Sequence, residues 1–296
     1  MESTRHRGIA GDRRTTRGRF APTPNGPLHL GSVVAALASF LSARRARGEW
    51  HVRIDDVDVA RTVPGAADAI LFELERLALP WDGPVVRQRD NTERYRAALA
   101  TLAREGRTFG CACSRREAGP GPYPGTCRNG SPGPARSIRM RADCIVAFRD
   151  RVQGDMTIDL AAETGDFIVH RADRVHAYHL AAAVDDGALG VTEIVRGADL
   201  LASTGPQLHV QRALGLPGPA YAHVPVATTA AGAKLAKSSA ARPSAERPAA
   251  DVLRRALAFL GHAPPGEIED PAGLVDWGVR SWDCSRVPRV RKARVE

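Results

Sequence analysis

The chain has 296 residues, of which 43% are hydrophobic and 25% charged, as in ordinary globular proteins with a substantial core. No run approaches the roughly 18 uninterrupted apolar residues of a membrane helix, and six arginines without an apolar block exclude a secretory signal from the first twenty residues. We therefore expect a cytoplasmic protein with no membrane partner.

The formal net charge of +9 is concentrated at the two ends of the chain. Residues 1–19 and 286–296 each carry +4, which leaves the rest close to neutral. Basic tails attract nucleic acid without sequence preference, although solubilising disordered ends explain either tail equally well. We expect residues 1–18 to form a mobile basic arm.

Expected strands alternate with expected helices along the chain. A strand ends at residues 19–20 and a Pro/Gly-rich loop follows at 21–31. We then expect helices at 32–48, 64–77, 92–105, 177–186 and 203–215, and strands at 50–54, 155–159, 167–169, 191–195 and 223–228. Ser32 is the expected cap of the first helix and Gly48 its expected end. This alternation favours an α/β fold with a parallel sheet, built from residues 19–105 and 166–240, with an insertion at 106–165 and a mainly helical segment at 241–296.

The segment RFAPTPNGPLHLGS, from Arg19 to Ser32, is a strand–loop–helix junction suited to phosphate. Its open loop lets the backbone approach a phosphate, and the N-terminus of the following helix favours negative charge. His29 stands where it could donate to the bridging oxygens of ATP, and Gly31 leaves room for the nucleotide. A purely structural turn explains this segment, taken alone, equally well.

Two of the chain's three lysines, Lys234 and Lys237, lie three residues apart in the segment KLAKS. A compact and mobile ammonium suits a pyrophosphate whose charge grows as the α-phosphate is attacked. Solvated surface lysines are the alternative explanation.

Three of the five cysteines, Cys111, Cys113 and Cys127, lie within 17 residues around a loop rich in proline and glycine. An odd number so clustered indicates a metal site rather than a disulfide framework. Three thiolates and one further donor would complete a closed tetrahedral zinc site that tethers the loop. Buried apolar cysteines are the alternative, and Cys144 is a candidate fourth ligand.

HLGS and KLAKS, about 200 residues apart, resemble the two signature motifs of the class I aminoacyl-tRNA synthetases. RFAPTPNGPLHLGS, VRIDDVD, FIVHRADRVHAYHLA and EIVRGADLL, in that order, are similar to the glutamyl and glutaminyl branch. Only about 55 residues follow KLAKS, which resembles the shortened group of glutamyl-queuosine tRNA(Asp) synthetases, without an anticodon-binding domain. The resemblance covers roughly residues 17–240 and implies a Rossmann-like catalytic domain.

The resemblance also implies roles for individual residues. The catalytic residues would be His29, Gly31, Lys234 and Lys237. ATP, carried with Mg²⁺ as co-substrate, would lie against Pro22, Thr23, Pro24, Asn25, Gly26, His29, Gly31, Ser32 and Lys237. Glutamate would be held by Arg19, Phe20, Ala21, Pro22, Thr23, Asp55, Tyr178 and Arg196. A structural zinc ion would be bound by Cys111, Cys113, Tyr123 and Cys127.

Two positions depart from the family's pattern. Asp55 stands where glutamate is usual, so its carboxylate is set back by roughly 1.5 Å, one carbon–carbon bond; we expect weaker binding of the same substrate. Ala236 replaces a serine in the second signature, from which we expect a lower rate. His179 has no role that the sequence assigns.

The implied reaction is activation of glutamate with ATP, without tRNA, and transfer of the glutamyl group to queuosine in the anticodon of tRNA(Asp). We expect a monomer. The alternatives are ordinary glutamylation of a tRNA 3′ end, a non-catalytic RNA-binding paralogue, and an adenylate-forming ligase for another acceptor.

Overall fold

The computed structural model describes residues 15–229 and 243–295. Its strands are β1 Arg17–Phe20, β2 Glu49–Ile54, β3 Val86–Arg87, β4 Thr108–Cys111, β5 Ser137–Met140, β6 Ile145–Asp150, β7 Gly154–Asp159, β8 Phe167–His170, β9 Glu193–Gly197, β10 Ala220–Val224, β11 Val226–Thr228 and β12 Lys292–Arg294. Its α-helices are α1 Leu30–Arg45, α2 Ala66–Arg76, α3 Thr92–Arg104, α4 Arg115–Ala118, α5 Leu160–Glu163, α6 Tyr178–Ala188, α7 Leu201–Ala213, α8 Ala249–Phe259 and α9 Pro271–Ser281.

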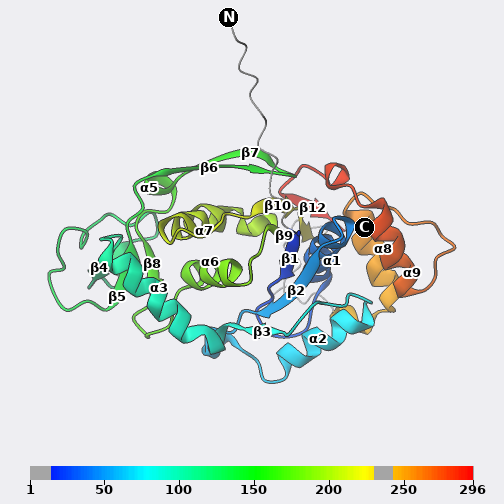
Figure 1. Cartoon of the computed structure of the whole chain (residues 1–296), viewed down its shortest axis with the longest axis horizontal. Helices are drawn as coiled ribbons and strands as arrows, with labels where there is room; N and C mark the ends of the chain where they lie inside the picture. The colour runs from blue at the N-terminus through cyan, green and yellow to red at the C-terminus, as the bar shows by residue number, and fades with distance from the viewer. Residues whose placement is uncertain (1–14, 230–242, 296) are drawn as a thin grey trace, which may run out of the picture.

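A parallel sheet forms the centre of the molecule (Figure 1). In one part β1, β2 and β3 pair in parallel, and in the other β9, β10 and β6 do, with β7 antiparallel at the edge. Hydrogen bonds between Arg17 and Thr192 join the two parts: the Thr192 N–H donates to the Arg17 carbonyl at 2.9 Å, and the Arg17 N–H to the Thr192 hydroxyl at 2.8 Å. The strand order is therefore β3-β2-β1-β9-β10-β6, which reverses between β1 and β9.

Helix α1 is almost wholly buried between the sheet and helices α8 and α9 (Figure 1). Its run of small and branched apolar residues allows this, because no charged side chain interrupts it before Arg44. The side chain of Trp50, on β2, is fully buried beside this helix and donates its Nε1–H to the Ser39 hydroxyl at 2.8 Å. Helices α6 and α7 belong to a second core cluster together with α3 and strands β5 to β10.

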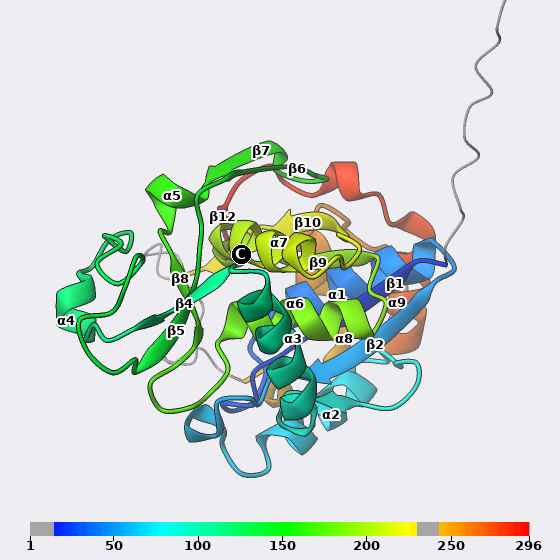
Figure 2. The ribbon, with the colours of Figure 1, turned by 60° about the vertical axis from the view of Figure 1, so that its left-hand side comes forward.

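An antiparallel sheet of β4, β5 and β8 lies at the end of the molecule opposite to α8 and α9 (Figure 1). Figure 2 shows α4 and its loop projecting beyond this sheet, while the β6–β7 hairpin runs along the top of the molecule. Residues 145–159, expected in the insertion, thus extend the central sheet through β6. No helix within residues 15–229 and 243–295 is both long and apolar enough to cross a membrane.

The predicted boundaries of α1 were wrong at both ends. The N-cap is His29, not Ser32, because the imidazole Nδ1 accepts a hydrogen bond from the Ser32 N–H at 3.3 Å. The helix ends at Arg45, and the left-handed residue after it is Arg47, with φ 55°. Gly48 has another role, since a Cβ there would lie 2.1 Å from the Thr16 carbonyl oxygen.

Two further differences between the predicted and the observed elements concern the C-terminal half of the chain. The strand predicted at 223–228 is divided into β10 and β11, because Pro225 between them has no N–H to donate. The basic C-terminal tail, for which a disordered end was one explanation, forms β12 in parallel pairing with β11.

The burial of α1 predicts the effect of shortening one of its side chains. Leu37 is 0% exposed, so Leu37→Ala should lower the free energy of unfolding by about 2–5 kcal/mol. Phe72, on α2, is 66% exposed, and Phe72→Ala should change it by less than about 0.5 kcal/mol. Urea denaturation followed by circular dichroism measures both; equal losses would contradict the placement of α1 in the core.

Candidate functional site

A cavity of ≈ 570 Å³ opens where the order of the parallel strands reverses. Ligands of open α/β sheets bind at this point, beyond the carboxyl ends of the strands. The walls come from the ends of β1, β9 and β10, the loop before α1, and the first residue of α6. The lining residues are Arg19, Phe20, Ala21, Pro22, Thr23, Asn25, Leu28, His29, Gly31, Ser32, Ala35, Tyr178, Val195, Arg196, Gly197, Asp199, Leu200, Val224, Pro225, Val226 and Ala227.

Most of the predicted ATP and glutamate residues meet in this cavity. Pro24 and Gly26 belong to the same loop but do not line it, and neither does Asp55. Lys234 and Lys237, with Ala236 between them, lie outside the described residues.

The N-terminus of α1 forms one side of the cavity. His29 lines it, and its Nδ1 accepts from the Ser32 N–H, which places the proton of the neutral ring on Nε2. Nε2 lies 3.2 Å from the Ser32 hydroxyl. A ring N–H, a hydroxyl and the helix N-terminus thus converge at this side, which suits the oxygens of a phosphate.

Behind Arg19, buried charges of both signs alternate. The Arg19 Nε lies 3.1 Å from Asp186 Oδ1, and the Arg53 Nη1 lies 2.7 Å from the same oxygen. Arg53 also donates to both oxygens of Asp55, at 2.6 and 3.3 Å. Burial raises the pKa of Asp55 in spite of Arg53, whereas Arg19 and Arg53 outweigh burial and lower the pKa of Asp186.

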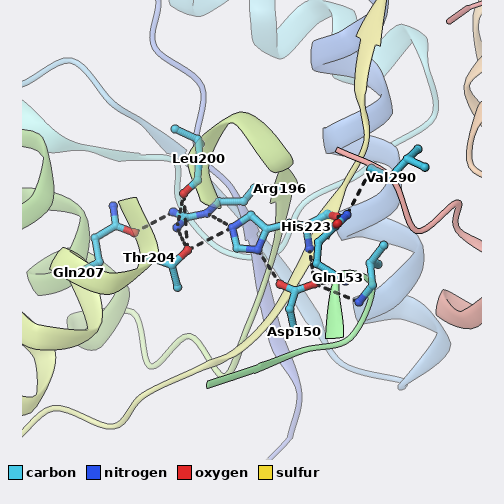
Figure 3. A network of polar contacts seen from close by, with 9 residues as sticks. Asp150, Gln153, Arg196, Leu200, Thr204, Gln207, His223 and Val290 are labelled. Atoms are coloured by element: carbon cyan, nitrogen blue, oxygen red, sulfur yellow. Dashed lines mark hydrogen bonds and ion pairs between the residues drawn. The ribbon is translucent and has the colours of Figure 1, made fainter. Parts of the chain in front are cut away.

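Arg196, at the end of β9, also lines the cavity, and its guanidinium group is held by neutral hydrogen-bond acceptors (Figure 3). Its Nε donates to His223 Nε2 at 3.0 Å, and its Nη1 to Gln207 Oε1 at 2.8 Å. Its Nη2 donates to the Thr204 hydroxyl at 2.9 Å and to the Leu200 carbonyl at 3.3 Å. All these contacts fix the plane of the guanidinium group.

His223 connects Arg196 to a carboxylate further from the cavity (Figure 3). Its Nδ1 lies 2.6 Å from Asp150 Oδ2, and both side chains are fully buried. Burial lowers the pKa of His223, although Asp150 opposes this. Hydrogen bonds from His223 and from the Gln153 N–H outweigh burial and lower the pKa of Asp150.

The sequence interpretation missed His223, Asp150, Thr204 and Gln207. His223 stands within an apolar strand, and Asp150 stands at the end of a strand. From the sequence alone, neither can be distinguished from a buried polar residue whose hydrogen bonds only stabilise the core. The single available signal was a polar side chain inside the buried run AYAHV.

Tyr178 and His179, the first two residues of α6, face different surroundings. Tyr178 lines the cavity. His179 does not; its ring stands edge-on to Phe167 with centroids 5.6 Å apart, and its Nδ1 has no hydrogen-bond partner in the described part of the chain. Burial lowers the pKa of His179 to about 4, so the ring is neutral and serves packing.

The cysteine cluster lies around α4, with Cys111 and Cys113 before this helix and Cys127 after it, and none of the three lines the cavity. The Sγ atoms of Cys111, Cys113 and Cys127 lie within 4.8 Å of one another. The Tyr123 hydroxyl is 3.4 Å from the first two and accepts the Cys127 N–H at 2.9 Å. Cys144 is not part of the cluster, since its Sγ lies 3.3 Å from His209 Nδ1.

These donors fit a tetrahedral zinc ion. Bonds of about 2.3 Å to sulfur place two ligand sulfurs roughly 3.8 Å apart, and Cys113 and Cys127 stand at 3.6 Å. Tyr123 lowers the pKa of Cys127 to about 6 by hydrogen bonding. The same effect of Tyr123 on Cys113 is outweighed by burial and by the other two cysteines, which raise the pKa of Cys113. Arg139 adds positive charge, with its Nε 3.3 Å from Cys111 Sγ.

Sequence comparison connects this geometry with known proteins. The family model of tRNA synthetases class I (E and Q), catalytic domain, matches residues 15–118 and 127–259. The chain is 51% identical to the glutamyl-Q tRNA(Asp) synthetase of Aromatoleum aromaticum over 93% of this chain and 91% of that protein. It is 49% identical to the protein of the same name from Thiobacillus denitrificans, over 92% and 94%.

A solved structure of a longer protein has the same fold. A glutamate-tRNA synthetase from Elizabethkingia anophelis superposes with a TM-score of 0.80 at 22% identity, over 96% of this chain and 68% of the other. The expected α/β fold with a parallel sheet is confirmed. The chain therefore belongs to the class I tRNA synthetases (E and Q) and, within them, to the group of the glutamyl-Q tRNA(Asp) synthetases.

Proposed function

We propose that the protein activates glutamate with ATP, without tRNA, and transfers the glutamyl group to queuosine in tRNA(Asp). The observation that carries the first step is the convergence of the α1 N-terminus, Arg19 and Arg196 on one cavity. A phosphate site and two guanidinium groups are what an acidic amino acid and a nucleotide require together. The acceptor follows from the relatives, whose name is glutamyl-Q tRNA(Asp) synthetase.

In the first step the α-carboxylate of glutamate attacks the α-phosphorus of ATP. The bond to the β-phosphate oxygen breaks, so glutamyl-adenylate forms and pyrophosphate leaves with the bond's electrons. His29 and the α1 N-terminus stabilise the growing negative charge, and Mg²⁺, with Lys234 and Lys237, is expected to act on the same phosphates.

The amino acid lies between the two arginines. Arg19 is paired with Asp186, whereas Arg196 is held by neutral acceptors, so Arg196 is the stronger attractor for the side-chain carboxylate. Tyr178 adds a hydroxyl at the same wall. Asp55 remains a candidate for the α-ammonium group, which it would approach from its bond with Arg53.

In the second step a hydroxyl of the cyclopentene ring of queuosine attacks the activated carbonyl. The ester bond forms, AMP leaves, and the hydroxyl proton passes to solvent or to the departing phosphate. The fold shared with a glutamate-tRNA synthetase makes the terminal adenosine of tRNA the rival acceptor.

Pyrophosphate exchange tests the activation step. The purified wild-type protein, with no tRNA present, should exchange pyrophosphate into ATP with glutamate at least about tenfold faster than with glutamine or aspartate. Glutamine has no carboxylate for the buried guanidinium group, and the carboxylate of aspartate is one methylene too short to reach it. Exchange only after tRNA is added would favour the charging rival. Silence under both conditions would indicate a binding module.

Removal of the 3′-terminal adenosine, rather than periodate treatment of the tRNA, separates the two acceptors. Periodate oxidises the cis-diol of the 3′-terminal ribose, so ordinary charging is lost. It also attacks the cyclopentene diol of queuosine, so the informative substrate is queuosine-containing tRNA(Asp) whose 3′ adenosine has been removed enzymatically. We expect full glutamylation of that tRNA and none of a queuosine-free tRNA(Asp); the reverse pattern would refute transfer to the base.

We further propose a structural zinc ion bound by Cys111, Cys113, Cys127 and Tyr123, with Tyr123 as the fourth donor. The distances support this set, because a zinc–oxygen bond near 2.1 Å beside zinc–sulfur bonds of 2.3 Å gives separations close to the observed 3.4 Å. The ion would tether a loop that has no strand or helix of its own between residues 119 and 136.

Substitutions in the cluster test this ligand set. Tyr123→Phe should weaken zinc binding about tenfold or more, since loss of an outer-shell partner already costs that much, and Cys127→Ser should do the same or worse. Cys144→Ser, an identical chemical change outside the cluster, should leave binding unchanged. Chelator competition with atomic-absorption analysis measures all three; equal affinities of wild type and Tyr123→Phe would exclude the tyrosine.

A further inference from the structure

We propose that Asp150 and His223 are positioning residues that orient Arg196 toward the side-chain carboxylate of the amino acid substrate. Neither residue lines the cavity, so neither is a catalytic residue. This inference rests on the proposed activation of glutamate. It assigns the selection of an acidic side chain to an arrangement of three buried side chains (Figure 3).

The first step of the argument is the proton on His223. The Arg196 Nε–H is a donor only, so the His223 Nε2 that faces it at 3.0 Å must accept. The Thr204 hydroxyl lies 3.2 Å from the same nitrogen and 3.5 Å from the Leu200 carbonyl, so its one proton can go to either acceptor. The proton of the neutral ring is therefore on Nδ1, where it donates to Asp150 at 2.6 Å.

The second step is the orientation of Asp150. Its Oδ1 accepts three backbone N–H groups, those of Val152 at 3.0 Å, Gln153 at 2.8 Å and His223 at 3.1 Å. Among residues 15–229 and 243–295, only the imidazole of His223 forms a hydrogen bond with the Asp150 Oδ2. The backbone of the β6–β7 turn and the N–H of His223 on β10 thus fix the carboxylate. The carboxylate fixes the tautomer of His223, which in turn presents an acceptor to Arg196.

The third step concerns charge. Within the part of the chain that the structure describes, Arg196 forms no ion pair with a carboxylate, in contrast to Arg19, which Asp186 contacts directly. The compensating charge of Asp150 stands behind His223. A carboxylate in direct contact would occupy the guanidinium group and compete with the substrate.

Four of the five N–H groups of Arg196 donate to His223, Gln207, Thr204 and Leu200. The fifth, on Nη1, has no partner among the described residues, and Arg196 lines the cavity. The arrangement fixes the group in one plane and leaves one donor and a net charge for a ligand carboxylate. The side-chain amide of glutamine in that place would accept a hydrogen bond from the Nη1–H of Arg196, but it would not neutralise the positive charge of the guanidinium group.

Asp150→Asn is the most informative test. The three backbone donors require the amide oxygen at the Oδ1 position, so the amide NH₂ faces His223 Nδ1. The imidazole proton then moves to Nε2, where it opposes the Arg196 Nε–H. We expect KM for glutamate in pyrophosphate exchange to rise about tenfold to a hundredfold, the value of a hydrogen bond to a charged group, while KM for ATP stays unchanged.

A simple charge effect predicts the opposite sign. Removing the negative charge of Asp150 would strengthen the attraction of Arg196 for a carboxylate and lower KM for glutamate. An unchanged or lower KM for glutamate in Asp150→Asn would therefore overturn the inference. Absence of exchange in the wild type would instead refute the proposed activation, so the two failures are distinguishable.

Substitutions of His223 provide a second test if Asp150→Asn does not fold. Glutamine can donate to Asp150 through its amide and accept from Arg196 through its carbonyl, whereas methionine, of the same length, can do neither. We expect His223→Gln to keep the preference for glutamate over glutamine in kcat/KM, and His223→Met to lose about tenfold or more of it. Equal preferences in the two variants would contradict the positioning role.

A matched control separates positioning from local damage. The Gln153 side chain donates to the His223 and Val290 carbonyls, at 2.9 and 3.2 Å, but not to Asp150 or Arg196. Gln153→Met should therefore leave KM for glutamate unchanged. A ¹⁵N spectrum of the histidine rings adds a direct readout: the signal lost in His223→Gln should be Nδ1-protonated in the wild type and Nε2-protonated in Asp150→Asn.

Discussion

The pairing of Arg17 with Thr192 is the constraint on which the site depends. These two residues are 175 positions apart, yet their hydrogen bonds hold the start of β1 beside the segment before β9. The connections from β1 and from β9 then leave in opposite directions across the sheet, so the loops that follow the two strands diverge. The cavity with Arg19 on one strand and Arg196 on the other exists because of that divergence.

The cavity brings guanidinium groups out of water, and each buried charge must be compensated. Asp186 compensates Arg19 and Arg53 directly, and Asp55 completes the set on that side. All these carboxylates stand behind the arginines rather than in the cavity. These two acids balance the charge of the arginines from outside the cavity. On the Arg19 side the carboxylate of Asp186 contacts the guanidinium group directly, whereas on the Arg196 side His223 lies between the guanidinium group and Asp150.

The sequence was sufficient to predict features that depend on residues close together in the chain. The phosphate loop, the alternation of strands and helices that indicates a parallel sheet, and the cysteine cluster could be predicted, because each rests on such residues. Strands β3, β4, β5, β6 and β12 were not predicted. The N-cap could not, since a hydroxyl at Ser32 is the usual cap and only the ring geometry shows His29 in that role. Asp55 was expected to face the substrate, but the residue order of a strand end does not show which partner a carboxylate contacts. The link from Asp150 to His223 spans 73 residues and has no periodic signal.

The turn between β6 and β7 shows how a segment outside residues 19–105 and 166–240, from which the sheet was expected to be built, acts on the cavity. It lies in the region expected as an insertion, yet β6 pairs with β10 and places Asp150 beside His223. Because backbone N–H groups hold the carboxylate, the side chains at positions 151 to 153 do not set its orientation. The geometry of Arg196 therefore depends on Asp150 and on the backbone shape of this turn, and it tolerates substitutions within the turn that preserve that shape.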